Sequence, residues 1–169
     1  MEDKVSNDPV VAIVGVTGAV GAEFIATMDK RGFRVGKLKA LASARSAGKT
    51  ISFRGQPVVI EELTERAFDG VDIALFSAGS GISKKFAPLA VKSGAVVVDN
   101  SSAFRMDPNV PLVIPEINAR SIRDHKGIIA NPNCAAITAL VPLWPIHQKN
   151  RIKRCLLYTS DAADDIALV

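Results

Sequence analysis

A glycine-rich segment, Gly15-Val16-Thr17-Gly18-Ala19-Val20-Gly21, constrains the fold of this chain more than any other feature. It directly follows an apolar run, residues 10–14, and it leads into residues 19–30, whose apolar side chains recur at helical spacing. We therefore expect a buried strand, a tight turn and an amphipathic helix. In such a turn Gly18 lets the backbone approach a phosphate, Gly21 lets the helix pack closely on the strand, and the helix N-terminus attracts the anion. The segment predicts a dinucleotide-binding loop; the alternative is a plain glycine turn in a sheet protein.

Apolar runs and amphipathic stretches alternate along the rest of the chain. We expect buried strands over residues 37–42, 71–76, 95–98 and 127–130, a helix over 83–92, and a small hairpin made of 51–53 and 56–60. Strands that alternate with helices of about ten residues indicate βαβ units and a parallel sheet. The predicted fold is therefore α/β, with a Rossmann-like, doubly wound, mostly parallel sheet over residues 9–154 that follows a flexible N-terminus over residues 1–8.

The loop after the second predicted strand indicates which dinucleotide binds. An NAD site usually places Asp or Glu there to accept a hydrogen bond from the ribose 2′-hydroxyl. This chain instead has Ser43-Ala44-Arg45-Ser46-Ala47-Gly48-Lys49, which offers a guanidinium, hydroxyls and an ammonium. Because a planar guanidinium suits a 2′-phosphate and a carboxylate would repel it, we predict NADP. The alternative is a solvated basic loop.

Cys134 lies in a segment, Asn131-Pro132-Asn133-Cys134, that links a predicted strand to an apolar stretch over residues 135–143. That position places it at the start of a helix, where the dipole and the free N–H groups favour the thiolate that attacks carbonyls. The alternative is an ordinary buried cysteine. Together with a nicotinamide cofactor, a thiolate suits oxidation of an aldehyde through a thiohemiacetal to a thioester, which then passes to an acceptor.

A second polar segment, Asn100-Ser101-Ser102-Ala103-Phe104-Arg105, follows the strand predicted over residues 95–98. It therefore lies at the carboxyl edge of the sheet, where α/β proteins bind ligands. The guanidinium of Arg105 matches phosphate and carboxylate oxygens, so we expect it to clamp an oxyanion. The alternative is a surface salt bridge with Asp107 or Glu116.

Composition excludes several other classes of function. The chain carries 21 Lys and Arg against 17 Asp and Glu, a charge of only +4, and no run of like charges favours nucleic-acid binding. Its apolar runs are shorter than the ~18 residues of a membrane span. Two cysteines make no disulfide framework, and residues 1–8 show no secretory signal. We expect a cytoplasmic protein, or a plastid one if the source is photosynthetic, without a metal site.

Several motifs occur in the order found in aspartate-semialdehyde dehydrogenases: residues 15–21, 43–48, 76–79, 99–105, 113–116 and 131–134. The chain resembles that family over residues 10–154. The resemblance implies reversible, NADPH-dependent reductive dephosphorylation of 4-aspartyl phosphate to aspartate 4-semialdehyde, on the route to lysine, threonine and methionine. N-acetyl-glutamyl-phosphate reductase is a rival, although it usually has Gly where this chain has Asn133. The Ser-x-Thr-x-x-Cys segment of glyceraldehyde-phosphate dehydrogenase is absent, and a non-catalytic dinucleotide-binding module is the third alternative.

The resemblance also assigns roles to individual residues. It implies that Cys134 is the acyl-thioester nucleophile, supported by Asn133, and that Arg105 binds the substrate's phosphate with Asn100 nearby. The residues that it implies for the cofactor site are Gly15, Thr17, Gly18, Ala19 and Val20 at the pyrophosphate, Arg45 and Ser46 at the 2′-phosphate, and Ser77, Ala78 and Gly79.

The C-terminal part departs from the family pattern. The family continues with a Ser-Thr-Tyr-Gln segment and a second α+β domain that supplies a catalytic His, a substrate Arg and the dimer interface; only the start of that domain is expected here. Residues 155–169 do not fit, and they resemble translated adapter or vector sequence. Neither His125 nor His147 matches the family's base. We therefore expect a fragment that binds cofactor weakly, aggregates readily and lacks measurable activity, whereas the full-length form binds a small-molecule substrate and phosphate as a homodimer or homotetramer.

Overall fold

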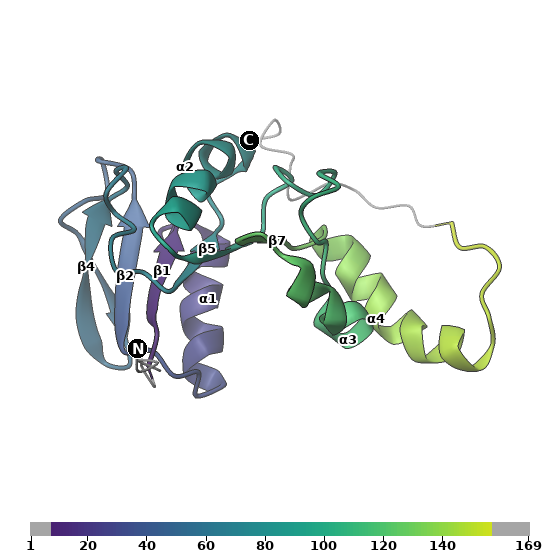
Figure 1. Cartoon of the computed structure of the whole chain (residues 1–169). Helices are drawn as coiled ribbons and strands as arrows, with labels where there is room; N and C mark the ends of the chain where they lie inside the picture. The colour runs from purple at the N-terminus through teal and green to yellow at the C-terminus, as the bar shows by residue number, and fades with distance from the viewer. Residues whose placement is uncertain (1–7, 157–169) are drawn as a thin grey trace, which may run out of the picture.

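The structure, a computed structural model, describes residues 8–156, so the expectations for residues 1–7 and 157–169 lie outside it. Within that range one sheet has the strand order β3-β4-β2-β1-β5-β6-β7, and every neighbouring pair is parallel except β3 with β4. The strands are β1 (Val10–Val14), β2 (Lys37–Ala42), β3 (Thr50–Phe53), β4 (Gln56–Glu62), β5 (Ile73–Phe76), β6 (Val96–Asp99) and β7 (Ile128–Ala130). The helices are α1 (Ala19–Lys30), α2 (Ser80–Lys92), α3 (Pro115–Asn118), the 3-10 helix η1 (Ala119–Asp124) and α4 (Cys134–Lys149). The prediction of a Rossmann-like, mostly parallel sheet is confirmed (Figure 1).

Helices cover both faces of this sheet, which explains why its central strands read as continuous apolar runs. Val11 and Ile13 of β1 pack in one buried cluster with Met28 of α1. The other face of β1 packs in a second cluster with Phe86 of α2, among other residues. All four residues from Val11 to Val14 are 0% exposed, as expected for a strand at the centre of three layers.

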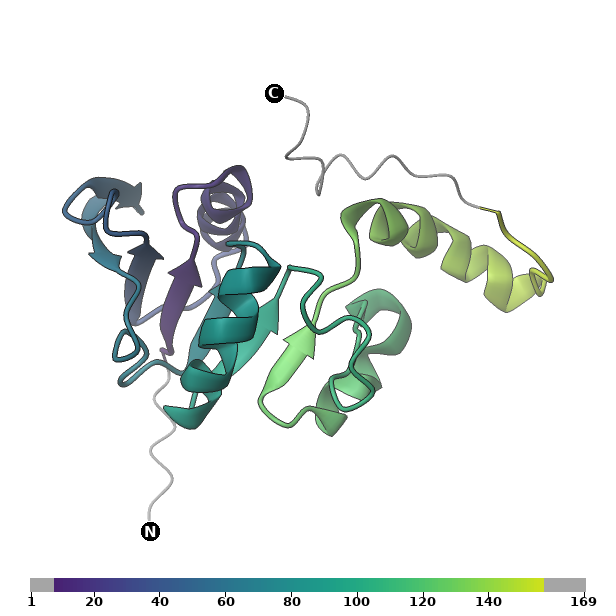
Figure 2. The same cartoon turned by 90° about the horizontal axis from the view of Figure 1, so that it is seen from above.

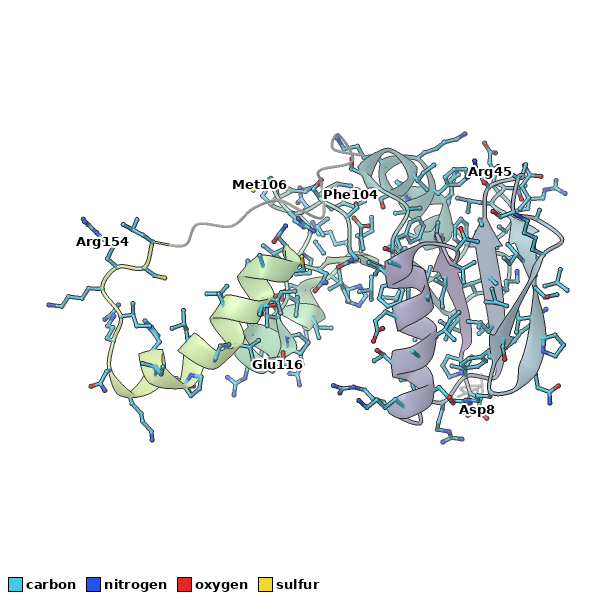
Figure 3. The ribbon with its side chains drawn as sticks, turned by 180° about the vertical axis from the view of Figure 1, so that it is seen from behind. Asp8, Arg45, Phe104, Met106, Glu116 and Arg154 are labelled. Atoms are coloured by element: carbon cyan, nitrogen blue, oxygen red, sulfur yellow. The ribbon has the colours of Figure 1, made fainter. Side chains whose placement is uncertain are left out.

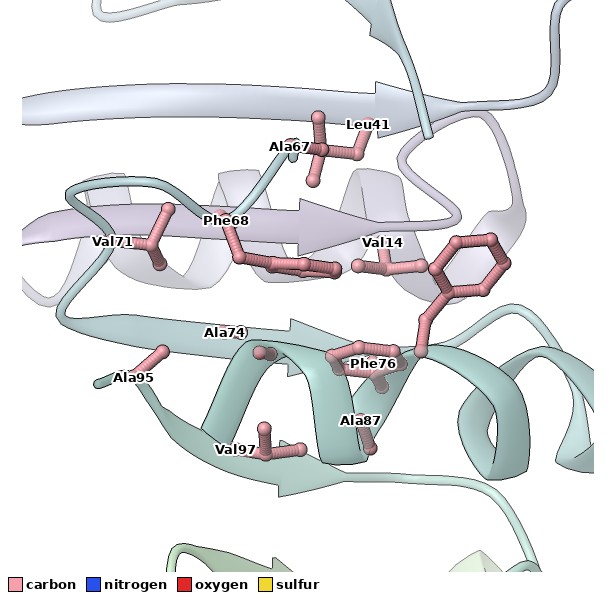
Figure 4. Packing of buried hydrophobic residues seen from close by; sticks show 13 residues of the cluster. Val14, Leu41, Ala67, Phe68, Val71, Ala74, Phe76, Ala87, Ala95 and Val97 are labelled. Carbon is pink, nitrogen blue, oxygen red and sulfur yellow. The ribbon is translucent and has the colours of Figure 1, made fainter. Parts of the chain in front are cut away.

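The connection from β4 to β5 contains no regular helix, yet it supplies a large part of the core. Phe68 of this connection is 0% exposed and stacks on Phe76 of β5, with ring centroids 5.8 Å apart and an interplanar angle of 17°. Figure 4 shows Phe68 and Phe76 lying with Val14 and Leu41 over one face of the strands. The aromatic pair therefore fills the space that a crossover helix occupies in other α/β folds.

Several element bounds differ by one to three residues from the sequence-based expectation, among them the end of β4, which reaches Glu62 instead of residue 60. Two of these differences have clear local reasons. β5 begins at Ile73 rather than at Val71, because the Val71 N–H donates to the carbonyl of Phe68 in a turn, 3.0 Å. Helix α2 begins at Ser80 rather than at Ser83, because Gly79, at φ +85°, turns the chain directly from β5 into the helix.

Helix α4 lies apart from the sheet, and both Figure 1 and Figure 2 show it extending away beyond β7. It is rich in apolar residues, but none of its sixteen residues is buried. With α3 and its flanking residues it borders an apolar groove of about 600 Å³, lined in part by Leu112, Ile114, Ile117, Leu140, Leu143 and Trp144. An apolar surface of this kind usually marks an interaction site or a solubility liability. No helix within residues 8–156 combines the length and the apolar character needed to cross a bilayer.

Candidate active site

The order of the strands reverses at β1, and the loops after β1 and β5 meet there. Gly15 has φ +87°, and a Cβ atom at this position would lie 2.5 Å from the carbonyl oxygen of Ser77. Only glycine fits such an approach of two backbones. In open α/β sheets, ligands bind in the crevice at this kind of switch point.

A cavity of about 520 Å³ opens at that crevice. Its lining contains Gly15, Thr17, Gly18, Ala42, Ser43, Ala44, Glu62, Leu63, Ser77, Ala78, Ile82 and Phe86. The structure therefore brings together five of the cofactor residues expected from the sequence, namely Gly15, Thr17, Gly18, Ser77 and Ala78.

Two helix N-termini lie beside the cavity. Ala19 and Val20 form the first turn of α1, and Gly79 is the N-cap of α2. No side chain caps either helix, and the first turns contain no acidic residue. The first N–H groups of both helices therefore remain available to an anionic ligand, which the helix dipoles also favour.

Gly21 and Gly18 have different structural roles in the loop. A Cβ atom on Gly21 would lie 2.7 Å from the Cα atom of Val16, so the close packing of α1 on the loop requires glycine there. A Cβ atom on Gly18 would find its nearest neighbour at 3.4 Å, the carbonyl oxygen of Gly15. The fold therefore tolerates a methyl group at position 18, and a requirement for glycine there would come from a ligand.

Arg45 and Ser46 lie in the turn after β2, at the edge of the sheet but outside the cavity lining. Figure 3 shows Arg45 at the same edge as Phe104 and opposite to Asp8. Arg45 is exposed, whereas Ser46 is 8% exposed. The structure thus leaves the guanidinium accessible, and the serine of this loop that lines the cavity is Ser43.

A second functional cluster, made of the polar residues Asn100, Arg105 and Asn131, follows β6 and β7. Arg105 donates from Nε to the carbonyl of Asn131 and from an Nη atom to the carbonyl of Asn100, both at 3.0 Å. The amide of Asn131 donates to Oδ1 of Asn100, 2.6 Å. Arg105 therefore joins the two loops, and its remaining N–H donors are left for an oxyanion. Within residues 8–156 it forms no salt bridge with Asp107 or Glu116, so that alternative is wrong.

Asp99, the last residue of β6, holds the residues around this cluster in place through hydrogen bonds. Its carboxylate is 0% exposed and accepts hydrogen bonds from the hydroxyl of Ser83 (2.7 Å), the N–H of Ser101 (3.1 Å) and the hydroxyl of Ser101 (2.8 Å). Its backbone carbonyl accepts from the N–H of Asn131, 2.8 Å. We did not predict a role for Asp99; the available signal was a carboxylate at the end of a wholly apolar strand.

Cys134 is the first residue of α4, and Asn133 is its N-cap. The side chain of Asn133 accepts a hydrogen bond from the N–H of Ala135, 2.8 Å, which fixes the start of the helix. Cys134 is exposed, so the alternative of an ordinary buried cysteine is wrong. The thiol thus sits at a capped helix start, three residues after the Asn131 carbonyl that holds Arg105.

Both histidines are engaged by their local backbone. Nδ1 of His125 accepts from the N–H of Gly127, 3.0 Å, and Nδ1 of His147 accepts from the N–H of Ile152, 3.2 Å. His147 also stacks on Trp144, with ring centroids 5.8 Å apart. Residues 8–156 contain no group of three His, Cys, Asp or Glu side chains with a geometry suited to a metal ion.

The sequence and the fold of this chain have close counterparts among known proteins. The family model described as semialdehyde dehydrogenase, NAD binding domain, matches residues 10–125. The chain belongs to this family. It is 47% identical over 152 residues to aspartate-semialdehyde dehydrogenase of Bacillus subtilis and 51% identical over 153 residues to that of Synechocystis, each match covering 90% of the chain. The predicted family and the predicted nicotinamide dinucleotide cofactor are confirmed.

The structural comparison agrees with the sequence comparison. The crystal structure of aspartate semialdehyde dehydrogenase II from Vibrio cholerae, complexed with ASA, superposes with a TM-score of 0.81 at 47% identity, covering 83% of this chain and 47% of that chain. The chain spans about half the length of the curated relatives it matches, 44% of the Bacillus protein and 45% of the Synechocystis protein.

Removal of the buried carboxylate tests the role of Asp99 beneath the second cluster. Asp99→Ala should lower the free energy of unfolding by about 2–4 kcal/mol, because it leaves the donors of buried Ser83 and half-buried Ser101 without an acceptor. Glu65→Ala removes an exposed carboxylate and should change it by less than about 0.5 kcal/mol. Urea unfolding followed by circular dichroism measures both, and equal effects of the two substitutions would show that the Asp99 network contributes nothing specific.

Proposed function

We propose that this chain is the NADP-binding and thiol-bearing part of an aspartate-semialdehyde dehydrogenase. The observation that carries the proposal is the placement of two chemical features at one edge of the sheet. The dinucleotide cavity lies at the β1–β5 switch point. The cluster of Arg105 and Asn131 follows the neighbouring strands β6 and β7, and Cys134 comes three residues after Asn131. A dinucleotide-dependent thiol dehydrogenase requires these two features side by side.

The residues at the switch point fit a dinucleotide. Gly15 leaves no side chain between the loops after β1 and β5, and the uncapped start of α1 offers N–H groups to a pyrophosphate. Accessible Arg45 would hold a 2′-phosphate, with the hydroxyl of Ser43 as a further donor, and Ser46 remains a prediction in that role. NADP supplies a hydride acceptor or donor when it is bound.

The second cluster supports acyl transfer. The thiol of Cys134 would add to the aldehyde carbon to give a thiohemiacetal. Its two-electron oxidation, for which bound NADP would supply the hydride acceptor and in which the hydroxyl proton is lost, would leave the acyl group on this sulfur as a thioester. Phosphate would then form a bond to the acyl carbon as the bond to sulfur breaks, which returns the thiol and yields the acyl phosphate. The remaining donors of Arg105 would bind the phosphate or the substrate's oxyanion, and Asn131 and Asn100 would keep the guanidinium in place.

Further functional groups would come from the half of the relatives that this chain does not match. Neither His125 nor His147 is free to act as a base at Cys134, since each accepts a backbone hydrogen bond elsewhere. A base from the second domain, a subunit interface in that domain and a cytoplasmic location follow from the resemblance. The exposed apolar face of α4 supports the proposal that the chain alone aggregates. The engagement of both histidines supports the proposal that it lacks turnover.

The preference for NADP depends on Arg45. Arg45→Ala should reduce the difference in binding free energy between NADPH and NADH by about 1–3 kcal/mol, the range for hydrogen bonds to charged groups. Fluorescence titration of both cofactors measures that difference. Arg123→Ala removes an exposed arginine beyond the sheet and should leave the difference unchanged. If the unmodified chain binds both cofactors with equal affinity, the assignment of NADP is wrong.

The role of Cys134 can be tested in a chimera of residues 1–154 with the remaining part of the Bacillus relative. Cys134→Ser should reduce phosphate-dependent oxidation of aspartate semialdehyde by at least about 10³-fold, because a hydroxyl is a far weaker nucleophile, while NADPH binding is retained. Substantial remaining turnover would place the nucleophile elsewhere. The unmodified chimera tested with N-acetyl-glutamate semialdehyde distinguishes the rival reductase, and no turnover of either aldehyde favours a non-catalytic module.

A further inference from the structure

The cavity at the switch point contains an acidic group that does not come from the loop after β2. Of the described residues that line this cavity, Glu62 alone has an ionisable side chain. It is the last residue of β4, and it is exposed. Within residues 8–156 its carboxylate forms no salt bridge and no side-chain hydrogen bond, so the charge is available to a ligand.

The pairing of β4 with β2 places Glu62 where its charge affects cofactor choice. Glu62 is aligned with Ala42, the last residue of β2, and the N–H of Leu63 donates to the carbonyl of Ala42, 2.8 Å. Dinucleotide sites specific for NAD usually have their acidic residue at the end of β2, where it accepts from the ribose 2′-hydroxyl. Here the neighbouring strand brings a carboxylate to the same end of the sheet.

We infer that Glu62 is a specificity-determining residue that opposes NADPH and favours NADH at this site, an inference that rests on the proposed dinucleotide-binding function. A carboxylate accepts hydrogen bonds from the two ribose hydroxyls of NADH and repels the 2′-phosphate of NADPH. Arg45, which follows Ser43 by two residues in the turn after β2, would have the opposite effect on both cofactors. The site therefore combines the cation of Arg45 with the anion of Glu62. Its preference for one cofactor over the other is smaller than the preference that Arg45 alone would give.

The test is a titration of the full chain with NADPH and with NADH. Glu62→Gln keeps the size of the side chain and removes its charge, and it should raise the ratio of NADPH affinity to NADH affinity about three- to tenfold. Glu62→Ala should raise the ratio in the same direction, and Glu62→Asp should leave it near the unmodified value. Glu61→Gln is the matched control, because it removes the same charge from the neighbouring exposed position outside the cavity, and it should change the ratio by less than about twofold.

Each result decides the inference. A ratio that stays unchanged in Glu62→Gln and Glu62→Ala, or two affinities that change by the same factor, would overturn the role of Glu62 while dinucleotide binding itself stands. If Glu61→Gln raises the ratio as much as Glu62→Gln does, the effect comes from the net charge of the chain and not from the position of Glu62. That result would also overturn the inference. An unmodified chain that binds neither cofactor at millimolar concentration would contradict the proposed function as well.

Discussion

The backbone contact between the loops after β1 and β5 is the constraint on which the cofactor site depends. Gly15 and the carbonyl of Ser77 approach so closely that no side chain fits between them. This approach sets the shape of the cavity and places the starts of α1 and α2 beside it. The buried layers on both faces of β1 keep the contact rigid, since Val11 to Val14 cannot shift without disturbing two core clusters. A dinucleotide site of this kind is therefore a property of the sheet as well as of its loops.

The cluster of Arg105, Asn100 and Asn131, after strands β6 and β7, is held in place by polar contacts rather than by apolar packing. Asp99 holds Ser83 and Ser101, and Arg105 joins the Asn100 loop to the Asn131 loop. Because these bonds involve charged groups in buried or half-buried positions, they fix geometry more strictly than exposed pairs do. They place the guanidinium beside the segment that leads to Cys134. The apolar helix α4 that follows lacks such support, and none of its residues is buried.

Local patterns were sufficient to predict most of the fold, because buried parallel strands and glycine turns leave direct traces in the sequence. The run over residues 10–14, the glycine loop and the exposed Cys134 at a helix start all agree with expectation. Contacts between distant segments leave no such trace. The pairing of Glu62 with Ala42 and the hydrogen bonds of Arg105 to two backbone carbonyls depend on strand order and loop shape. Sequence spacing alone also allowed a salt bridge between Arg105 and a nearby carboxylate. That salt bridge is absent from the described structure, because the loop shape directs Arg105 to two backbone carbonyls instead.

Hydrogen exchange with and without NADPH tests most directly the central claim that this edge of the sheet is a cofactor site. Bound pyrophosphate should protect the backbone N–H groups at the starts of α1 and α2, which no side chain caps. Mass spectrometry of peptides should therefore show slower exchange over residues 15–22 and 77–83, with no change over residues 138–149 of α4. Unchanged exchange at residues 15–22, with protection confined to the groove between α3 and α4, would contradict the account.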